Sequence, residues 1–262
     1  MRENNSKVKI KALELAKLLK LPGWEKEILE CLQEDPDVDV KIAALSALAE
    51  IGEGRTGFSS GYIKSINPEA PIYIALEGVA YALEASSQQR YEKLEGEAYK
   101  ALVRLLYSSK ESIDVINECL YNPTLLPLTC LIIASDLKNF EHAKNSIKTI
   151  YNTAIENDKE IDPELLIAYY LLYPEKIKKE ELENQDYINF TRIFNIYMDS
   201  RTPENIASLC LMILTQNKMT YELIENWIKL NPNMEESARL KALTANMQVA
   251  PQRPDLEKQT IT

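Results

Sequence analysis

Glycine and histidine are scarce in this chain of 262 residues, which contains seven glycines and one histidine. Average proteins contain about 7% glycine, and a large all-β fold needs many tight turns that use it, so the shortage favours long helices. A single histidine excludes a metal site built from several histidines and argues against histidine-dependent catalysis. We therefore expect a helical protein that is not an enzyme, with no catalytic, cofactor or metal residues.

The four cysteines are far apart, and no CxxC pair occurs. This spacing excludes zinc ribbons and thioredoxin-type redox motifs. Each cysteine lies among apolar residues, which predicts buried free thiols. The longest apolar runs are about half as long as a membrane span, and lysines interrupt the N-terminal apolar residues that a signal peptide would need. These features predict a cytoplasmic protein.

Positive charge is in deficit, with 30 basic residues against 40 acidic ones and a net charge of −10. Residues 1–22 hold six basic and two acidic side chains, so the remaining 240 residues carry a net charge of −14. A nucleic-acid binder needs a basic footprint, which argues against that class of partner. An acidic body attracts basic proteins, and these are the partners that we expect.

Helical periodicity covers almost the whole chain, and a capping side chain followed by proline marks six expected helix starts. Asp, Asn or Thr can accept hydrogen bonds from the free N–H groups of a first turn, and proline lacks a donor that would be wasted there. The starts recur at intervals typical of two-helix repeats. The six pairs are Asp35-Pro36, Asn67-Pro68, Asn122-Pro123, Asp162-Pro163, Thr202-Pro203 and Asn231-Pro232.

The first two of these segments share one apolar pattern. Apolar residues follow Asp35 with spacings of i, i+3, i+4, i+7, i+8 and i+11, and the same pattern returns 32 residues later after Asn67. So wide a stripe of small residues suits a helix that is packed between neighbours on two sides. We therefore predict that Ala44, Ala47 and Leu48 are buried between helices.

The segment Asp35–Gly52 resembles the second helix of HEAT-like (PBS-lyase-type) repeats, which reads Asp-Pro, Val-Arg, spaced Ala, Ala-Leu-Gly, then Ile or Leu and Gly. Lys41 stands where arginine is usual and Ala49 where glycine is usual. The match is partial over Asn67–Leu83, where Tyr73 replaces the basic residue. The resemblance implies an all-α fold, an α-solenoid of HEAT-like helical hairpins whose concave surface commonly binds other macromolecules.

Bulkier side chains in the second half distinguish it from these repeats. We therefore expect HEAT-like repeats over residues 1–109 and divergent repeats or a helical bundle over 110–249. Residues 250–262 have two prolines and no apolar period, which predicts a flexible tail.

The sequence GEGRTG at residues 52–57 has the G-x-G-x-x-G spacing of a dinucleotide fingerprint. That motif should follow a strand, whereas this one follows a helical segment, and the Gly-Lys-Ser/Thr of a P-loop is missing. We interpret it as a helix C-cap at Gly52 followed by a long loop. Side chains of that loop, Arg55, Phe58 and Tyr62, are candidates for contact with a partner.

Tyrosine outnumbers phenylalanine fourteen to four. A tyrosine buries a large ring and keeps a polar tip, which suits both interfaces and the margins of helix–helix contacts. Tyr81, Tyr169, Tyr170 and Tyr173 are the candidates for a binding face.

The first functional interpretation is a non-catalytic helical-repeat protein that binds a basic protein, as a scaffold, an adaptor or an inhibitor such as an immunity protein. An enzyme on the same scaffold is the alternative from the resemblance, because HEAT-like folds include bilin lyases and DNA glycosylases. The acidic body argues against a glycosylase, whereas a bilin lyase leaves no short motif to test. A third interpretation is a membrane-surface adaptor that uses the lysine-rich N-terminal helix, although that helix also suits the cap of a solenoid.

Overall fold

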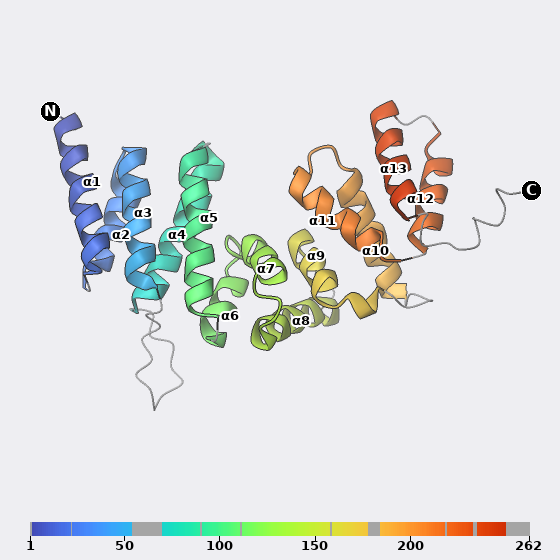
Figure 1. The fold of residues 1–262 in the computed structure, drawn as a ribbon, viewed down its shortest axis with the longest axis horizontal. Coiled ribbons are helices and arrows are strands. Elements are labelled where there is room, and N and C mark those ends of the chain that lie inside the picture. The colour runs from blue at the N-terminus through green and yellow to red at the C-terminus, as the bar shows by residue number, and fades with distance from the viewer. Residues whose placement is uncertain are drawn as a thin grey trace, which may run out of the picture. The chain divides into compact units, whose positions relative to one another are not determined.

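Helices form the whole of the secondary structure that the computed structural model describes (Figure 1). Thirteen α-helices and one short 3₁₀ helix occur in the described residues, with no strand among them, which confirms the all-α prediction. The chain divides into two compact units, Met1–Ile150 and Tyr151–Thr262. The described residues are 2–21, 23–53, 70–89, 91–110, 112–157, 159–177, 184–217, 219–232 and 235–249.

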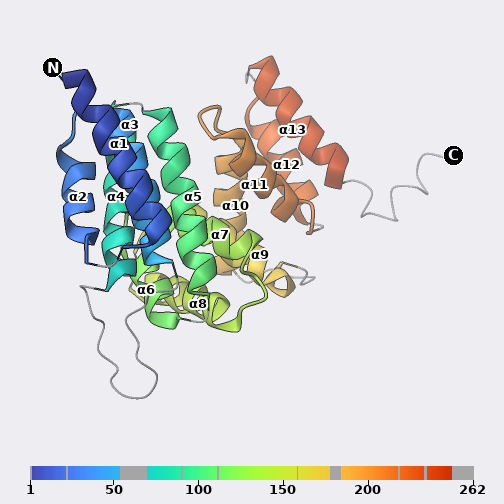
Figure 2. The ribbon, with the colours of Figure 1, turned by 60° about the vertical axis from the view of Figure 1, so that its left-hand side comes forward.

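Unit 1 contains two layers of helices. In one layer α1, α3 and α5 lie side by side, and in the other α2 and α4 pack against them and against each other (Figures 1 and 2). Helices that alternate along the chain therefore share a layer. The bounds are α1 (Arg2–Leu19), α2 (Glu25–Glu34), α3 (Val38–Gly52), α4 (Pro71–Gln89), α5 (Glu92–Ser108), α6 (Ile113–Tyr121), α7 (Leu126–Ser135) and α8 (Glu141–Glu156).

The division between the units falls inside α8, whereas the sequence suggested a boundary after residue 109. α6 and α7 stay in unit 1 because α7 packs on both α5 and α6. The Ser146 hydroxyl of α8 also donates to Asn117 Oδ1 of α6 at 2.8 Å. The predicted tail, residues 250–262, lies outside the described part of the chain.

α3 is the central helix of unit 1, and it contacts α1, α2, α4 and α5. Ala44, Ala47 and Leu48 are each 0% exposed, as the apolar pattern predicts. Small side chains let the neighbouring helices approach closely. A Cβ atom added to Gly52 would lie 2.8 Å from the Ala75 Cβ of α4, so Gly52 ends α3 as a close-packing residue rather than as the predicted C-cap.

One of the six proline signals lies at its helix start as expected, and a second lies in the turn that precedes a helix. Asp162 caps the next helix, since its Oδ1 accepts from the backbone N–H of Glu164 at 3.0 Å and Pro163 is the first helical residue. Asn122 Oδ1 accepts from the backbone N–H of Thr124 at 2.9 Å and so closes the turn before α7.

The other described signals lie near helix ends without capping them. α3 is capped by Asp37, not Asp35, because the Asp37 side chain accepts from the N–H of Asp39 at 2.9 Å. The Thr202 hydroxyl donates to a carbonyl of the preceding helix, and Asn231 lies at the end of its helix rather than at the start of the next. Asn67-Pro68 lies outside the described residues.

A buried lysine joins three helices of unit 1. Lys41 of α3 is 7% exposed, and its ammonium group donates to the carbonyl oxygens of Leu32 at 2.6 Å and Gln33 at 2.9 Å. It also donates to the Tyr81 hydroxyl of α4 at 3.1 Å. The carbonyls at the C-terminal end of α2 carry the negative end of the helix dipole, so the ammonium group is stabilised there.

A second polar contact fixes α1 to the same place. The buried carboxylate of Asp35 accepts hydrogen bonds from the ammonium group of Lys9 and from the backbone N–H of Asp37. Burial alone would raise the pKa of Asp35, but these hydrogen bonds and the charge of Lys9 lower it. α1 and α2 are thereby connected to the start of α3.

Unit 2 is a smaller group of helices around α10. α10 packs on α9, α11 and α13, and α12 packs on α13. Aromatic contacts fill this core: the rings of Phe194 and Trp227 lie 5.4 Å apart, and the Tyr197 hydroxyl donates to the carbonyl oxygen of Lys241. The bounds are α9 (Pro163–Leu172), η1 (Pro174–Lys176), α10 (Asn184–Met198), α11 (Glu204–Leu214), α12 (Met219–Leu230) and α13 (Glu236–Val249).

Replacement of Ala47 by glutamate tests the packing of α3. An unpaired carboxylate in this seam should lower the free energy of unfolding by more than about 3 kcal/mol in urea denaturation. Thr149, which is exposed on α8, provides the control, since Thr149→Glu should change stability by less than about 0.5 kcal/mol. Equal stability of the Ala47→Glu protein and the wild type would contradict the alignment of α3.

The Lys41 contacts can be tested by a double-mutant cycle. Lys41→Met removes the side-chain donor of the buried Leu32 carbonyl and one of the two donors of the Gln33 carbonyl, at a cost of about 2–3 kcal/mol, and Tyr81→Phe should cost about 1 kcal/mol. Because the two groups bond to each other and share the Gln33 carbonyl, the double variant should lose less than the sum of the single losses in urea denaturation. Strict additivity would show that the two contacts are independent.

Candidate functional site

Two of the tyrosines predicted to form a binding face belong instead to the core of unit 2. Tyr169 and Tyr170 of α9 are 4% and 0% exposed. The Tyr169 ring stacks on Tyr151 with 3.7 Å between the ring centroids, and it lies 5.2 Å from the half-buried ring of Tyr173. Buried rings cannot contact a partner, so the prediction for Tyr169 and Tyr170 is corrected: these two tyrosines are packing residues.

Hydrogen bonds within this cluster give the buried polar atoms their partners. The Tyr170 hydroxyl donates to Asp186 Oδ1 at 2.8 Å, and the Asn189 amide donates to the hydroxyls of Tyr151 at 2.6 Å and Tyr170 at 3.2 Å. Burial raises the pKa of Tyr170 well above its ordinary value, so its proton stays in place to make the bond to Asp186. The network joins α8, α9 and α10.

Tyr81 has a structural contact as well as a partly exposed ring. Its hydroxyl donates to the carbonyl oxygen of Gln33 at 2.8 Å and accepts from Lys41, whose Nζ lies 5.1 Å from the ring centroid. The ring lies between α2 and α4 and is partly exposed, so its place still suits binding, as does that of the half-buried Tyr173. The loop candidates Arg55, Phe58 and Tyr62 lie outside the described residues.

The outer side of α2, α4 and α6 carries a group of carboxylates. We call it the acidic face and define it by five half-buried or exposed residues: Glu30 of α2, Glu77 and Glu84 of α4, and Asp114 and Glu118 of α6. On α4, Glu77 and Glu84 are seven residues apart and lie on the side opposite the buried Ile72 and Val79.

α6 lies close to the same side of α4. The hydroxyl of Tyr73 on α4 is buried, and after burial itself the charges of Asp114 and Glu118 are the main causes that raise the pKa of Tyr73. Carboxylates of α6 therefore lie near the first turn of α4. Tyr121, at the end of α6, is 70% exposed beside them.

Charge is distributed very unequally between the two layers of unit 1. The helices α2, α4 and α6 contain eight carboxylates and one lysine, Lys26, whereas α1, α3 and α5 contain nine basic and seven acidic residues. In the second set the charges neutralise each other: Glu50 of α3 accepts from Lys20 at 3.1 Å and pairs with Arg104 of α5. The acidic face therefore gives unit 1 a negative side.

Sequence reasoning found the net charge but not its location. The signal is visible once the helix periods are known, because Glu77 and Glu84 fall opposite the apolar stripe that was used to align α4. What the pattern could not supply is which helices share a layer, since that depends on the packing of α2 against α4.

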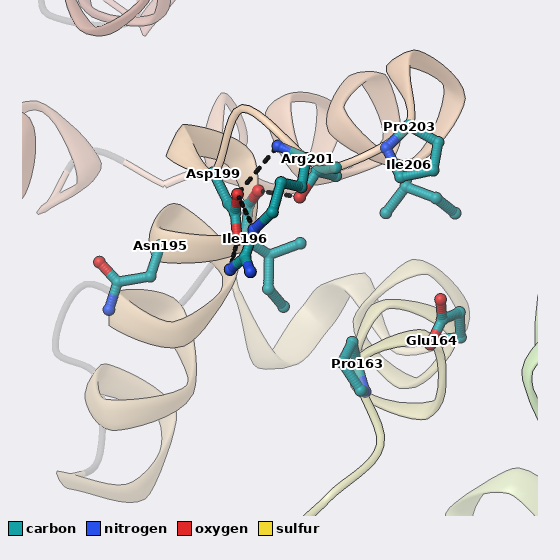
Figure 3. Close-up of a pocket in the computed structure, with 9 residues that line it drawn as sticks. Pro163, Glu164, Asn195, Ile196, Asp199, Arg201, Pro203 and Ile206 are labelled. Carbon is teal, nitrogen blue, oxygen red and sulfur yellow. Dashed lines mark hydrogen bonds and ion pairs between the residues drawn. The ribbon is translucent and has the colours of Figure 1, made fainter. Parts of the chain in front are cut away.

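A cavity of about 540 Å³ lies in unit 2, between the start of α9 and the loop that joins α10 to α11 (Figure 3). On the loop side, Arg201 Nη2 donates to Asp199 Oδ2 at 2.8 Å, and Arg201 Nε donates to Oδ1 of the same carboxylate at 3.1 Å. Glu164 lies on the other side, at the start of α9. The Thr202 hydroxyl donates a hydrogen bond to the carbonyl oxygen of Ile196 at 2.7 Å.

The two carboxyl groups of this cavity differ in protonation. Hydrogen bonds from the Arg201 side chain and backbone lower the pKa of Asp199 to about 2. Burial, followed by the neighbouring carboxylate of Asp162, raises the pKa of Glu164 to about 7. At neutral pH the cavity thus contains the ionised carboxylate of Asp199, which is paired with Arg201, and the partly protonated carboxyl group of Glu164. Both groups can form hydrogen bonds with a polar ligand.

The cysteines and the single histidine are not part of the acidic face or of this cavity. Cys119, Cys130 and Cys210 are buried free thiols as predicted, and Cys31 is half-buried. His142 is exposed in the first turn of α8. Within the described ranges, no three His, Cys, Asp or Glu side chains come together as metal ligands, and no helix there is long and apolar enough to cross a membrane.

Comparison with protein-family models and with curated proteins gives no match for this chain. The functional argument therefore rests on the acidic face.

Replacement of Glu164 by glutamine tests the buried carboxyl group. A raised pKa means that the folded protein holds this proton more tightly than the unfolded chain, so the contribution of Glu164 to stability is present at pH 4 and is lost as the pH rises through about 7. We expect Glu164→Gln to unfold at a higher temperature than wild type at pH 8 and at a similar temperature at pH 4.5. A constant difference at both pH values would contradict the raised pKa.

Proposed function

We propose that this protein is a non-catalytic helical-repeat protein that binds a basic protein partner through the acidic face of unit 1. The observation that carries the proposal is the cluster of five carboxylates on helices that hold a single lysine, next to a layer whose charges pair with each other. Like charges held together on one side repel one another, and a cationic partner relieves that repulsion.

The repeat part of the proposal is supported by the fold of unit 1 and by the sequence. The pattern of Asp35–Gly52 returns in α4, and alternate helices share a layer, which is the arrangement that stacked helical hairpins require. HEAT-like repeats of this kind would form an α-solenoid. The local pattern and the layers are therefore consistent with each other.

The acidic face also contains the side chains that could supply affinity. Charge complementarity mainly accelerates encounter and rejects wrong partners, whereas buried aromatic side chains account for most binding energy. The half-exposed ring of Tyr81 lies on the same layer as Glu77 and Glu84, and Tyr121 lies beside Glu118. A partner with an arginine or lysine cluster around an apolar centre fits this surface. A scaffold, an adaptor or an inhibitor of a basic protein would use it in the same way.

Charge reversal on α4 tests the proposal. The full chain is used to capture its partner from cells of its source, the partner is identified by mass spectrometry, and the association rate is then measured with purified partner. We expect a basic partner whose association slows as salt shortens the range of the charges. Glu77→Lys combined with Glu84→Lys should reduce the association rate by at least about tenfold at low salt.

The matched control is Glu156→Lys combined with Glu160→Lys, which changes the net charge equally at exposed positions outside the acidic face. It should alter the association rate by no more than about twofold, since only the general charge of the chain changes. An acidic partner, a rate that does not depend on salt, or equal effects of the two double variants would contradict the proposal. Circular dichroism and thermal unfolding confirm that each variant is folded.

A further inference from the structure

The exposed side of α1 carries an apolar stripe that packs on nothing described in unit 1. Val8, Leu15 and Leu19 are 67%, 53% and 56% exposed. With Ala12 they have the spacing i, i+4, i+7 and i+11, which places them along one face of the helix. That spacing is the one by which a helix packs along another helix. The adjoining face of α1, with Leu13 and Ala16, is buried.

An apolar groove continues this stripe toward α2. The groove has a volume of about 360 Å³. Its wall on α1 includes Ala12 and Leu15, and its wall on α2 includes Ile28 and Cys31, with the 57% exposed ring of Trp24 at the end. A groove between two helices that ends in an exposed tryptophan has the shape and the chemistry to receive a third helix.

The two rims of this groove have opposite charge. Lys7 and Lys11, one turn apart and exposed, lie on the α1 side. Glu27 lines the groove on the α2 side, and Glu34 lies on the same face of α2 seven residues later. Lys11 pairs with Glu14 of its own helix, but both side chains are largely exposed, so that pair costs little to rearrange.

We propose that this face binds a second copy of the same chain, in a two-fold symmetric dimer. In such a dimer α1 of one copy lies in the groove of the other, so that the apolar stripe of α1 covers Trp24 and Ile28 of its neighbour. The lysines of each α1 then meet the glutamates of the opposing α2. In a two-fold symmetric dimer every contact occurs twice, once in each direction. The basic half of each face therefore meets the acidic half of the other copy's face.

The acidic rim distinguishes this occupant from an anionic membrane surface. A flat bilayer would have to contact both rims to cover the groove, and the glutamates of α2 would then face lipid phosphates of the same sign. A narrow helix meets both rims at once with matched charges. The glutamates involved are not among the five that define the acidic face, so the variants that test the dimer differ from those that test the proposed function.

Sedimentation velocity of the full chain across micromolar concentrations tests the dimer. Wild type should show a reversible monomer–dimer equilibrium. Leu15→Glu should weaken dimerisation by more than about tenfold, because it places a carboxylate in the apolar stripe. Leu240→Glu is the matched control, since Leu240 of α13 is 65% exposed and lies in unit 2, and it should leave the equilibrium unchanged.

Charge exchange tests the pairing of the rims. Lys7→Glu with Lys11→Glu makes both rims acidic, and Glu27→Lys with Glu34→Lys makes both rims basic, so each double variant alone should be monomeric. A mixture of the two should form a one-to-one dimer, because each α1 again meets an α2 of opposite charge. A monomeric wild type, a mixture that stays monomeric, or monomers that sediment with phosphatidylserine vesicles through this face would overturn the proposal.

Discussion

The ammonium group of Lys41 determines how the helices of unit 1 meet. It is buried, and three neutral oxygen atoms from α2 and α4 surround it. A buried cation is costly unless every one of its hydrogens finds an acceptor, so α2 must end where its last carbonyls face α3. The Tyr81 hydroxyl, which also bonds to Gln33, fixes α4 against the same carbonyl. The positions of two layers therefore follow from one side chain.

Much of this fold could be predicted from the sequence, because helical periods are local. The six expected helix starts lie within a few residues of observed ones, and the alignment that buried Ala47 and Leu48 is correct. The tyrosines of α9 show where prediction failed. A run of bulky apolar residues with hydroxyl groups suits an interface as well as a core, and only the hydrogen bonds of Tyr170 to Asp186 and Asn189 separate the two cases.

The candidate site was less predictable than the fold for a physical reason. Net charge is a sum over the chain, whereas a binding surface depends on which carboxylates share a side of the packed helices. Glu50, which pairs with Lys20 and Arg104, is as acidic in sequence as Glu77, but the first is neutralised by its neighbours and the second is exposed. The difference arises from tertiary structure, because it depends on the neighbour that each helix faces.

The central position of α3 also affects how unit 1 unfolds. Arrays in which each repeat touches only the next one can lose their terminal repeats one at a time, with little cooperativity. In unit 1, α3 contacts four helices. Its Glu50 also forms ion pairs with Lys20, which follows α1, and with Arg104 of α5. When α3 unfolds, α1, α2, α4 and α5 lose their shared neighbour together. The first five helices of this chain should therefore unfold together, because the loss of α3 removes packing from each of its four neighbours at once.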